Sequence, residues 1–352
     1  MHKTTRHPQL VRGSDFWSTA TECPNKQVAR YDLRPTPMSV ETLASAVRAE
    51  MAKAIAGQNA IVDQLLVAIL ADGHVLIEGV PGVAKTLMVR TLARALDLSY
   101  GRVQFTPDLM PSDILGTFVF DPKTNDFKLR KGPIFVNVLL ADEINRTPPK
   151  TQAALLEAME ERTATIDGEL HQLPPPFAVF ATQNPIDFEG TYPLPEAQQD
   201  RFLLKIIVQY PTHDAEIEVL RRHHAGFRPQ NLDDAGIKPV VTGPELTTMR
   251  EEVRRSTVEE KIFAYIQAIV DSTRRSQDLS VGASPRAGIA LLNCSKAIAA
   301  LRGRDYVIPD DVKELALPVL RHRVLMRPEA EIEGLTVDRV LTGLLDAQVV
   351  PR

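Results

Sequence analysis

The chain has 352 residues, of which 44% are apolar and 24% charged, and its formal net charge is −4 at pH 7. This length is typical of two or three compact domains, and the composition is that of a soluble globular protein. The slight acidity excludes a general attraction to nucleic acid or to an anionic membrane, although a local basic patch stays open.

The two cysteines, Cys23 and Cys294, are far apart in the sequence and form no pattern of metal ligands or of paired disulfides. This usage favours a reducing, cytoplasmic setting. The basic residues near the N-terminus are not followed by the apolar core of a signal sequence. No run approaches the roughly 18 apolar residues that a membrane-spanning helix needs. We therefore expect a soluble cytoplasmic protein.

Residues 1–38 mix charged residues, threonine and proline without periodicity, which is typical of a flexible tail. Helical patterns follow at 39–55 and 60–70, with Gly57 and Gln58 between them.

From residue 74 onward, short apolar segments alternate with helical patterns. We expect strands at 74–78, 101–105, 136–141 and 177–182, and helices at 85–96 and 153–160. Continuous apolar strands that alternate with helices predict a parallel sheet covered on both faces, so the fold class is α/β.

Two segments interrupt this alternation. Residues 118–131 contain the turn-like Lys123–Asp126 between apolar flanks, and residues 163–173 contain Asp167 and Gly168, a strong signal for a β-hairpin. Because the tips of both segments are polar, we expect them to project from the core.

After residue 211 we expect no further strands. Helical patterns cover 213–225, 244–255, 259–273, 285–301 and 309–320. The predicted layout is an α/β domain at 39–211, a linker at 212–242 that begins with the first of these patterns, and an all-helical domain at 243–352.

A glycine-rich loop joins the first strand to its helix and reads Gly79-Val80-Pro81-Gly82-Val83-Ala84-Lys85-Thr86. The glycines let backbone N–H groups turn inward and form an anion-binding nest at a helix N-terminus. Lys85 can reach the β- and γ-phosphates of a nucleotide, and the Thr86 hydroxyl can bind Mg²⁺. An ordinary glycine-rich turn is the alternative, and the Lys-Thr pair after a strand counts against it.

Ala84 stands where the strict form of this motif has a glycine. Its N–H remains available for the nest. We expect Ala84 to have a negative φ, as at the start of a helix.

Polar residues also follow two later strands. Asp142 and Glu143 come after the strand at 136–141, and ligands bind at the carboxyl edge of open parallel sheets. Asp142 can hold Mg²⁺ through water, and Glu143 can polarise an attacking water. Asn184 can hydrogen-bond the γ-phosphate or that water. A helix cap at Asp142 and an Asn-Pro turn at Asn184 are the structural alternatives.

Taken in order, these elements resemble an AAA+ ATPase, specifically the MoxR family. The resemblance covers roughly residues 40–345 and rests on Gly79–Thr86, Asp142–Arg146, Thr151–Glu161, Ala181–Pro185, Tyr192–Gln198 and Asp200–Phe202. It implies a three-layer αβα core with a phosphate loop, followed by a small all-helical lid domain. It also implies ATP and Mg²⁺ as cofactors.

The resemblance assigns roles to further residues. It implies that Asn184 is the first sensor of the γ-phosphate and that Arg201 is an arginine finger acting in the neighbouring subunit's site. Arg286 resembles a second sensor that closes over the nucleotide from the lid. The alternatives are a surface ion pair of Arg201 with Asp200 or Glu196, and an exposed Arg286 without a role.

The resemblance gives a weaker indication of the residues that lie near the adenine base of the nucleotide. Gly57 and Gln58 match the family's segment near the adenine, and Leu87 extends the predicted nucleotide-binding set. Residues 106–133 resemble the family's insert in its second helix, and residues 163–173 resemble its hairpin before the first sensor.

The resemblance further implies a chaperone-like ATPase that remodels a partner protein, in metal or cofactor insertion or in complex maturation. It implies a homo-oligomeric ring, a hexamer in relatives, and a client such as a protein with a von Willebrand factor A domain. A nucleic-acid motor is one alternative, against which the pI of 6.1 counts. The other alternative is a nucleotide-gated binding module that hydrolyses little ATP. Whether Glu143 supports hydrolysis distinguishes this module from an ATPase.

The densest basic stretch of the chain is Arg321-His322-Arg323 followed by Met326-Arg327. Basic clusters usually form a solvated face, and this one could also contact an acidic partner or a neighbouring subunit.

Overall fold

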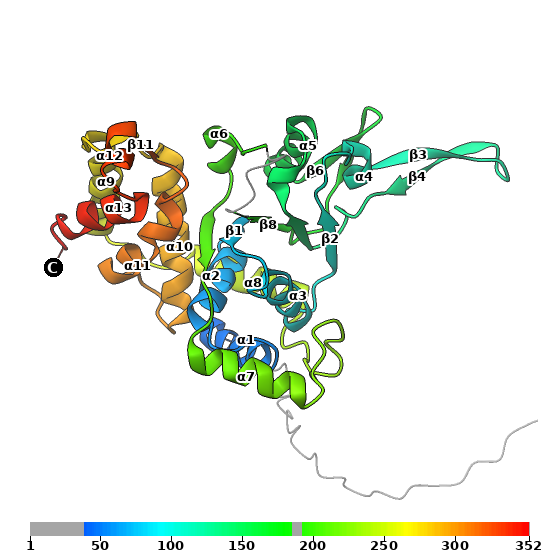
Figure 1. Ribbon diagram of the computed structural model, residues 1–352, viewed down its shortest axis with the longest axis horizontal. Coiled ribbons are helices and arrows are strands. Elements are labelled where there is room, and N and C mark those ends of the chain that lie inside the picture. Colours follow the sequence, from blue (N-terminus) through cyan, green and yellow to red (C-terminus); the bar gives the residue numbers. More distant parts are fainter. Residues whose placement is uncertain (1–38, 185–191, 352) are drawn as a thin grey trace, which may run out of the picture. The chain divides into compact units, whose positions relative to one another are not determined.

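A five-stranded parallel sheet forms the centre of the α/β part of the chain (Figure 1). This computed structural model describes residues 39–184 and 192–351, so the predicted tail at 1–38 lies outside the described residues. The strands are β1 (Val75–Gly79), β2 (Tyr100–Gln104), β5 (Val138–Asp142), β8 (Ala178–Gln183) and β9 (Leu204–Val208), in the spatial order β2-β5-β8-β1-β9.

Four of these strands were predicted, and β9 was not. β9 forms the edge of the sheet beside β1, and its buried residues alternate with the partly exposed Lys205 and the exposed Ile207. Its five residues therefore lack the continuous apolar character that identified the central strands.

Helices cover both faces of the sheet. On one face lie α1 (Val40–Ala52), α2 (Asn59–Leu70) and α3 (Lys85–Ala95), which share a core with alternate strand residues such as Ile77. On the other face α5 (Pro149–Glu161) packs against the intervening residues, such as Leu76, in a second core. This alternation confirms the predicted three-layer αβα architecture.

Two hairpins leave this core as predicted. The first, β3 (Gly116–Asp121) and β4 (Asp126–Lys131), follows the short helix α4 (Pro111–Leu115) and extends well beyond the sheet (Figure 1). The second, β6 (Thr163–Ile166) and β7 (Glu169–Gln172), turns at Asp167 and Gly168, both of which have a positive φ.

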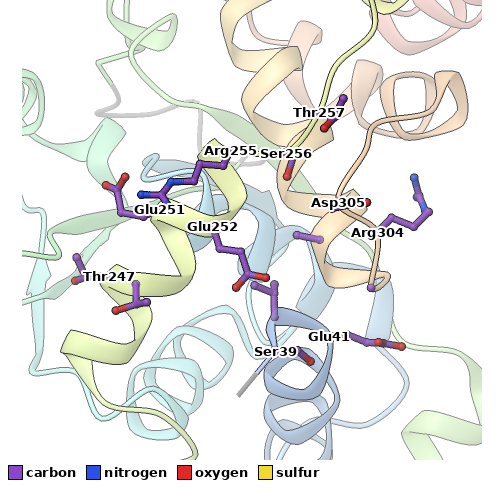
Figure 2. Close-up of a pocket in the computed structure, with 14 residues that line it drawn as sticks. Ser39, Glu41, Thr247, Glu251, Glu252, Arg255, Ser256, Thr257, Arg304 and Asp305 are labelled. Atoms are coloured by element: carbon purple, nitrogen blue, oxygen red, sulfur yellow. The ribbon is translucent and has the colours of Figure 1, made fainter. Parts of the chain in front are cut away.

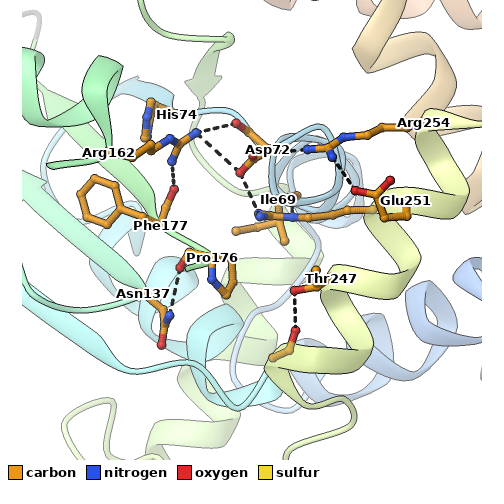
Figure 3. A network of polar contacts seen from close by, with 12 residues as sticks. Ile69, Asp72, His74, Asn137, Arg162, Pro176, Phe177, Thr247, Glu251 and Arg254 are labelled. Atoms are coloured by element: carbon orange, nitrogen blue, oxygen red, sulfur yellow. Dashed lines mark hydrogen bonds and ion pairs between the residues drawn. The ribbon is translucent and has the colours of Figure 1, made fainter. Parts of the chain in front are cut away.

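A network of arginines ties the base of the second hairpin to the helical part of the chain (Figure 3). Arg162, directly after α5, donates to the Asp72 carbonyl at 2.8 Å and to the Phe177 carbonyl. Arg250, in α8 (Gly243–Arg254), donates to the Asp72 carboxylate at 2.9 Å and to the Ile69 carbonyl at 2.7 Å. The end of α2 is thereby joined to the α5–β6 turn and to α8.

The C-terminal part of the chain is a helical lid, as predicted. Its further helices are α9 (Glu260–Arg275), α10 (Pro285–Leu301), α11 (Pro309–Leu320), α12 (Pro328–Ile332) and α13 (Val337–Asp346). The expectation that strands end at residue 211 is wrong, because β10 (Leu279–Val281) pairs antiparallel with β11 (Leu325–Met326). Strands of two or three residues are too short to give a periodic signal.

The predicted linker at 212–242 contains α7 (His213–His224) and then a stretch without regular structure. Leu232, Ile237 and Val241 of this stretch are buried in the core shared with α1–α3. The segment is thus packed against its surroundings, and the domain limits at 211 and 242 stay predictions. None of the helices within 39–184 and 192–351 has the length and apolar character required to cross a bilayer.

The interpretation of Arg321-His322-Arg323 as a solvated or partner-binding face is wrong for its last two residues. Arg323 and His322 are buried where α11 meets the segment before β9. Arg323 donates to the Asp200 carboxylate at 2.7 Å and to the carbonyls of Phe202 and Leu203 at 2.6 and 3.0 Å. A buried guanidinium is tolerated when its donors are satisfied in this way, so the cluster attaches the lid to the sheet.

Candidate nucleotide-binding site

A pocket of about 900 Å³ lies at the carboxyl edge of the sheet. Its lining residues include Gln58, Pro81, Gly82, Val83, Ala84, Lys85, Thr86, Leu87, Asp142, Glu143, Thr182 and Asn184. The structure therefore brings together the predicted phosphate loop, the acidic end of β5 and the residue after β8. The carboxyl ends of parallel strands lie at one edge of the sheet. For this reason Ala84 and Asn184, which are far apart in the sequence, line the same pocket.

The phosphate loop connects β1 to α3. Gly79 ends β1 so close to β9 that a Cβ atom there would lie 2.6 Å from the Val208 carbonyl oxygen, which explains the glycine. Lys85 begins α3, and its ammonium donates to the carbonyls of Gly79 and Val80, the latter at 3.4 Å. Neither Gly79 nor Val80 lines the pocket, and their carbonyls instead hold Lys85 beside it.

Burial lowers the pKa of Lys85, although the nearby carboxylates of Asp142, Glu143 and Glu78 oppose that shift. The ammonium is thus partly desolvated and lies close to negative charge. Such a group gains strongly from a phosphate ligand, because charge interactions are stronger away from bulk water.

Ala84 has a φ of 63° and a ψ of 22°, which is the left-handed region, so the expected negative φ is wrong. The loop needs this conformation in the residue before α3, where the strict motif has glycine. An L-residue in this region costs about 1–2 kcal/mol. Strain of this kind is often found where a loop binds a ligand.

Asp142 is held from two sides. Its Oδ1 accepts a hydrogen bond from the Thr182 hydroxyl at 2.6 Å, and its Oδ2 accepts from Arg102 Nη2 at 2.7 Å. Sequence reasoning gave neither Arg102 nor Thr182 a role, because Arg102 belongs to no recognisable motif and Thr182 contributed only as part of the segment Ala181–Pro185. Their places on β2 and β8, the strands on either side of β5, become clear only from the sheet order.

Glu143 has a φ of 58°, so the chain turns sharply where β5 ends. Its N–H donates to the Thr182 hydroxyl at 2.8 Å, and its carboxylate accepts from Gln104 Nε2 at 2.8 Å and pairs with Arg146 at 3.0 Å. These contacts orient the carboxylate at the wall of the pocket. Asn184, which is buried, lines the same pocket, so the two polar strand ends face one space.

The far wall of the pocket is apolar. Ile55, Tyr210, Val219, Leu220 and Phe227 contribute to it. Such a wall suits a flat heterocyclic base.

Polar side chains also line the pocket beside this apolar group, among them Glu216, Arg222 and His223 of α7 (His213–His224). Gln58 lines the pocket, and its Oε1 is buried without a hydrogen-bond partner among the described residues. An unpartnered buried amide oxygen is costly, so this atom is a candidate contact for a ligand that displaces its surroundings. Gly57 does not line the pocket. A Cβ atom there would lie 2.6 Å from Ala215 Cβ, so this glycine lets α7 approach closely.

The predicted magnesium ligands, Thr86 and Asp142, line the same pocket. Within residues 39–184 and 192–351, no group of three or more His, Cys, Asp or Glu side chains is placed to hold a metal. Magnesium at nucleotide sites takes only one or two protein ligands and completes its shell with phosphate and water. A hydroxyl and a carboxylate beside a phosphate loop fit that requirement.

Arg201 and Arg286 do not line this pocket. Both form an ion pair with Glu160, near the end of α5, at 3.0 Å for Arg201 and 3.2 Å for Arg286. The expectation that Arg286 closes over the pocket of its own chain is therefore not met. The alternative, an ion pair of Arg201 with Asp200 or Glu196, is wrong in its partner, because Arg201 pairs with Glu160 and Asp200 accepts from Arg323.

The two arginines line a second pocket, of about 280 Å³, together with Arg162 and Arg323. A third pocket, of about 670 Å³, lies between α1, α8 and the turn after α10 (Figure 2). Glu251 and Glu252 of α8 and Glu41 of α1 face it beside Arg255 and Arg304. Its mixed charge and its lack of a phosphate loop distinguish it from the nucleotide pocket.

Comparison with known proteins agrees with this geometry. Residues 74–204 match the model of the ATPase family associated with various cellular activities (AAA), and residues 271–343 match the AAA lid domain. The chain is 46% identical to the uncharacterized protein YeaC of Bacillus subtilis, with 85% of this chain and 92% of that protein aligned. It is 42% identical to the chaperone MoxR1 of Mycobacterium tuberculosis, over 89% and 83%.

A more distant relative is the protein MoxR of Methylorubrum extorquens, 31% identical over 80% of this chain and 88% of its own length. Among solved structures, a Cytophaga hutchinsonii protein provisionally assigned as an ATPase superposes with a TM-score of 0.82. It is 40% identical, and the alignment covers 89% of this chain and 96% of that one.

Proposed function

This chain belongs to the MoxR family of AAA+ ATPases and hydrolyses ATP, and we propose that it couples each turnover to the remodelling of a partner protein. The observation that carries the proposal is the convergence of Lys85, Asp142, Glu143 and Asn184 on one pocket. This set combines a phosphate-binding cation, a metal-binding carboxylate, a base for water and a neutral γ-phosphate contact.

In this proposal, the backbone N–H groups of the loop and the ammonium of Lys85 bind the β- and γ-phosphates. Thr86 and Asp142 would hold Mg²⁺, which supplies charge neutralisation on the phosphate oxygens when bound. Glu143 orients and polarises the attacking water, and Asn184 hydrogen-bonds the γ-phosphate. The contacts of Asp142 with Thr182 and Arg102 support this division of roles, because they fix its carboxylate beside the loop.

The apolar wall and Gln58 form the proposed base site. The ring of adenine would contact Ile55 and Leu220, and its exocyclic amine could donate to the unpartnered Oε1 of Gln58.

Assembly completes the proposed site. Arg201 and Arg286 lie together outside the pocket of their own chain, and a pair of guanidiniums is well suited to the charge that develops on a γ-phosphoryl group. We propose that they act on the nucleotide of the next subunit. A head-to-tail contact of this kind gives a ring when its rotation closes, and we propose a hexameric ring, which the family resemblance implies.

The client is proposed to be a protein, as the name of the chaperone MoxR1 suggests for that relative. Metal or cofactor insertion and complex maturation are the tasks that we propose, with a von Willebrand factor A domain protein as the first client to test. The proposed location is the cytoplasm.

Two substitutions test the pocket. Lys85→Ala should abolish ATP binding, because the loop loses its cation.

Glu143→Gln should leave binding intact and reduce turnover by roughly 10²- to 10⁴-fold, because the general base is lost. Titration calorimetry and phosphate release measure the two effects, with Glu331→Gln on an exposed surface as the control. Unchanged turnover of Glu143→Gln would show that hydrolysis at this site is not the function.

A mixing experiment tests the action between subunits. Arg201→Ala and Lys85→Ala chains should each be inactive alone and should recover activity when mixed, because some interfaces then pair an intact pocket with intact arginines. The specific activity of the unmodified protein should also rise with its concentration. A monomer with full turnover, or no recovery on mixing, would contradict the proposed arrangement.

A further inference from the structure

A single carboxylate joins the two arginines that lie outside the nucleotide pocket. Glu160 Oε2 pairs with Arg201 Nη2 at 3.0 Å, and Glu160 Oε1 accepts from Arg286 Nη2 at 3.2 Å. The two oxygens of one side chain thus hold one arginine from the segment before β9 and one from the start of α10 in the lid.

A shared anion offsets the repulsion between these two cations. Two guanidiniums brought to adjacent positions repel each other, and both remain partly exposed, with 32% of the Arg201 side chain and 58% of the Arg286 side chain accessible. Because both guanidiniums bond the two oxygens of one carboxylate, the positions of their N–H groups are set relative to each other.

The other carboxylates of this region are engaged elsewhere. Asp200 accepts from Arg323 at 2.7 Å and from the Ser284 hydroxyl at 3.1 Å. Asp72 accepts from Arg250 at 2.9 Å. Within the part of the chain that the structure describes, Glu160 is therefore the carboxylate that Arg201 and Arg286 have in common.

Glu160 also lies on the helix that starts next to the acidic end of β5. At the beginning of α5, Gln152 Nε2 donates to the carbonyls of Ile144 and Thr147, both at 3.1 Å, directly after Glu143. At the other end of the same helix, Glu160 holds the arginine pair. One rigid element thus connects the pocket of a chain with the arginines that the chain would offer to its neighbour.

From this geometry we infer that Glu160 is a positioning residue for the ATPase reaction of the adjacent subunit. It holds Arg201 and Arg286 side by side, so that both guanidiniums meet the neighbour's γ-phosphate in one orientation. This inference rests on the proposed function, because it requires the arginines to act between subunits.

The first test is Glu160→Gln, which keeps the size of the side chain and removes its charge. We expect turnover to fall roughly 10- to 100-fold, the loss typical of misplaced catalytic groups, while the affinity for ATP in the chain's own pocket stays unchanged. Glu157→Gln is the matched control, because Glu157 lies one turn earlier on α5 and is exposed. Unchanged turnover of folded Glu160→Gln would overturn the inference.

Mixing separates a positioning role from a merely structural one. Glu160→Gln chains mixed with Lys85→Ala chains should recover activity, because the second chain offers correctly held arginines to the intact pocket of the first. Glu160→Gln mixed with Arg201→Ala should not recover, because both chains then carry the same defect. A lid that is only loosened by the substitution would not give this pattern.

The outcomes also separate this inference from the proposed function. If Arg201→Ala with Lys85→Ala recovers activity but Glu160→Gln with Lys85→Ala does not, the inference fails and the proposed function stands. If neither mixture recovers, the arrangement between subunits itself is wrong. Should Glu160→Gln fail to fold, Glu160→Asp serves instead. Its shorter carboxylate cannot reach both arginines, and it should give the same mixing pattern with a smaller loss.

Discussion

At the scale of single residues, burial and charge fix two groups of the proposed phosphate site at the carboxyl edge of the sheet. The ammonium of Lys85 is partly desolvated and donates to backbone carbonyls, and the carboxylate of Asp142 is held between a hydroxyl and a guanidinium. Both groups are charged, and both have partners on the protein, so their positions are set without a ligand. Preorganised charges of this kind cost little reorganisation during a reaction.

The lowered pKa of Lys85 predicts a pH dependence of nucleotide binding. Burial disfavours the charged form, so the ammonium loses its proton at a lower pH than an ordinary lysine. ATP affinity should therefore weaken as the pH rises, starting below the ordinary lysine pKa of about 10.4. Titrations of a fluorescent ATP analogue between neutral pH and this value measure the effect, with circular dichroism to show that the fold persists. An affinity that is constant over this range would contradict the prediction.

At the scale of elements, the start of α3 combines a helix N-terminus with a strained residue. Ala84 and Glu143 both have a positive φ, at 63° and 58°, and both border the nucleotide pocket. The loop before α3 and the turn after β5 therefore keep non-glycine residues in a conformation that favours glycine.

Replacing Ala84 tests this strain directly. Ala84→Gly should leave the free energy of unfolding unchanged or raise it by up to about 1 kcal/mol, because the relief of the left-handed strain outweighs the greater freedom of glycine in the unfolded chain. Ala153→Gly, at an exposed position inside α5, should instead lower it by about 0.5–1 kcal/mol. Urea unfolding of the two variants provides the comparison. An Ala84→Gly variant as destabilised as Ala153→Gly would contradict the left-handed conformation.

At the scale of the described α/β domain and lid, one buried arginine attaches the lid to the sheet. Arg323 is 3% exposed in its side chain and bonds the Asp200 carboxylate and the carbonyls of Phe202, Leu203 and Val319. Asp200, Phe202 and Leu203 flank Arg201 in the sequence, so the same contact that attaches the lid also fixes the segment that carries the proposed finger.

Removing the guanidinium of Arg323 should lower the free energy of unfolding substantially. Arg323→Met should destabilise the protein by about 3–5 kcal/mol, because Asp200 then keeps a largely buried charge without its partner. Arg275→Met, which removes an ion pair with 80% of the arginine side chain exposed, should cost only about 0–1 kcal/mol. Chemical unfolding checks both values. In the double variant with Asp200→Asn, part of the loss should return, and a fully additive loss would argue against a direct pair.

The sequence by itself indicated the α/β core, the helical lid, the hairpin at 163–173, the projecting segment at 118–131, and the phosphate loop and acidic strand end that line one pocket. It could do so because these features depend on local patterns: unbroken apolar strands, a glycine-rich loop before a helix, and carboxylates directly after a strand. The family resemblance then indicated Arg201 and Arg286 as nucleotide-site residues.

Only the tertiary structure decided which side chains meet. It brought Arg102 and Thr182 to Asp142, placed Arg201 and Arg286 on Glu160 and not over their own pocket, and buried Arg323. It also gave Ala84 a left-handed conformation that its residue type does not favour. These contacts join residues from different elements, and their partners follow from strand order and lid position. No periodicity or spacing along the chain encodes such neighbours, because they arise only when distant segments pack together.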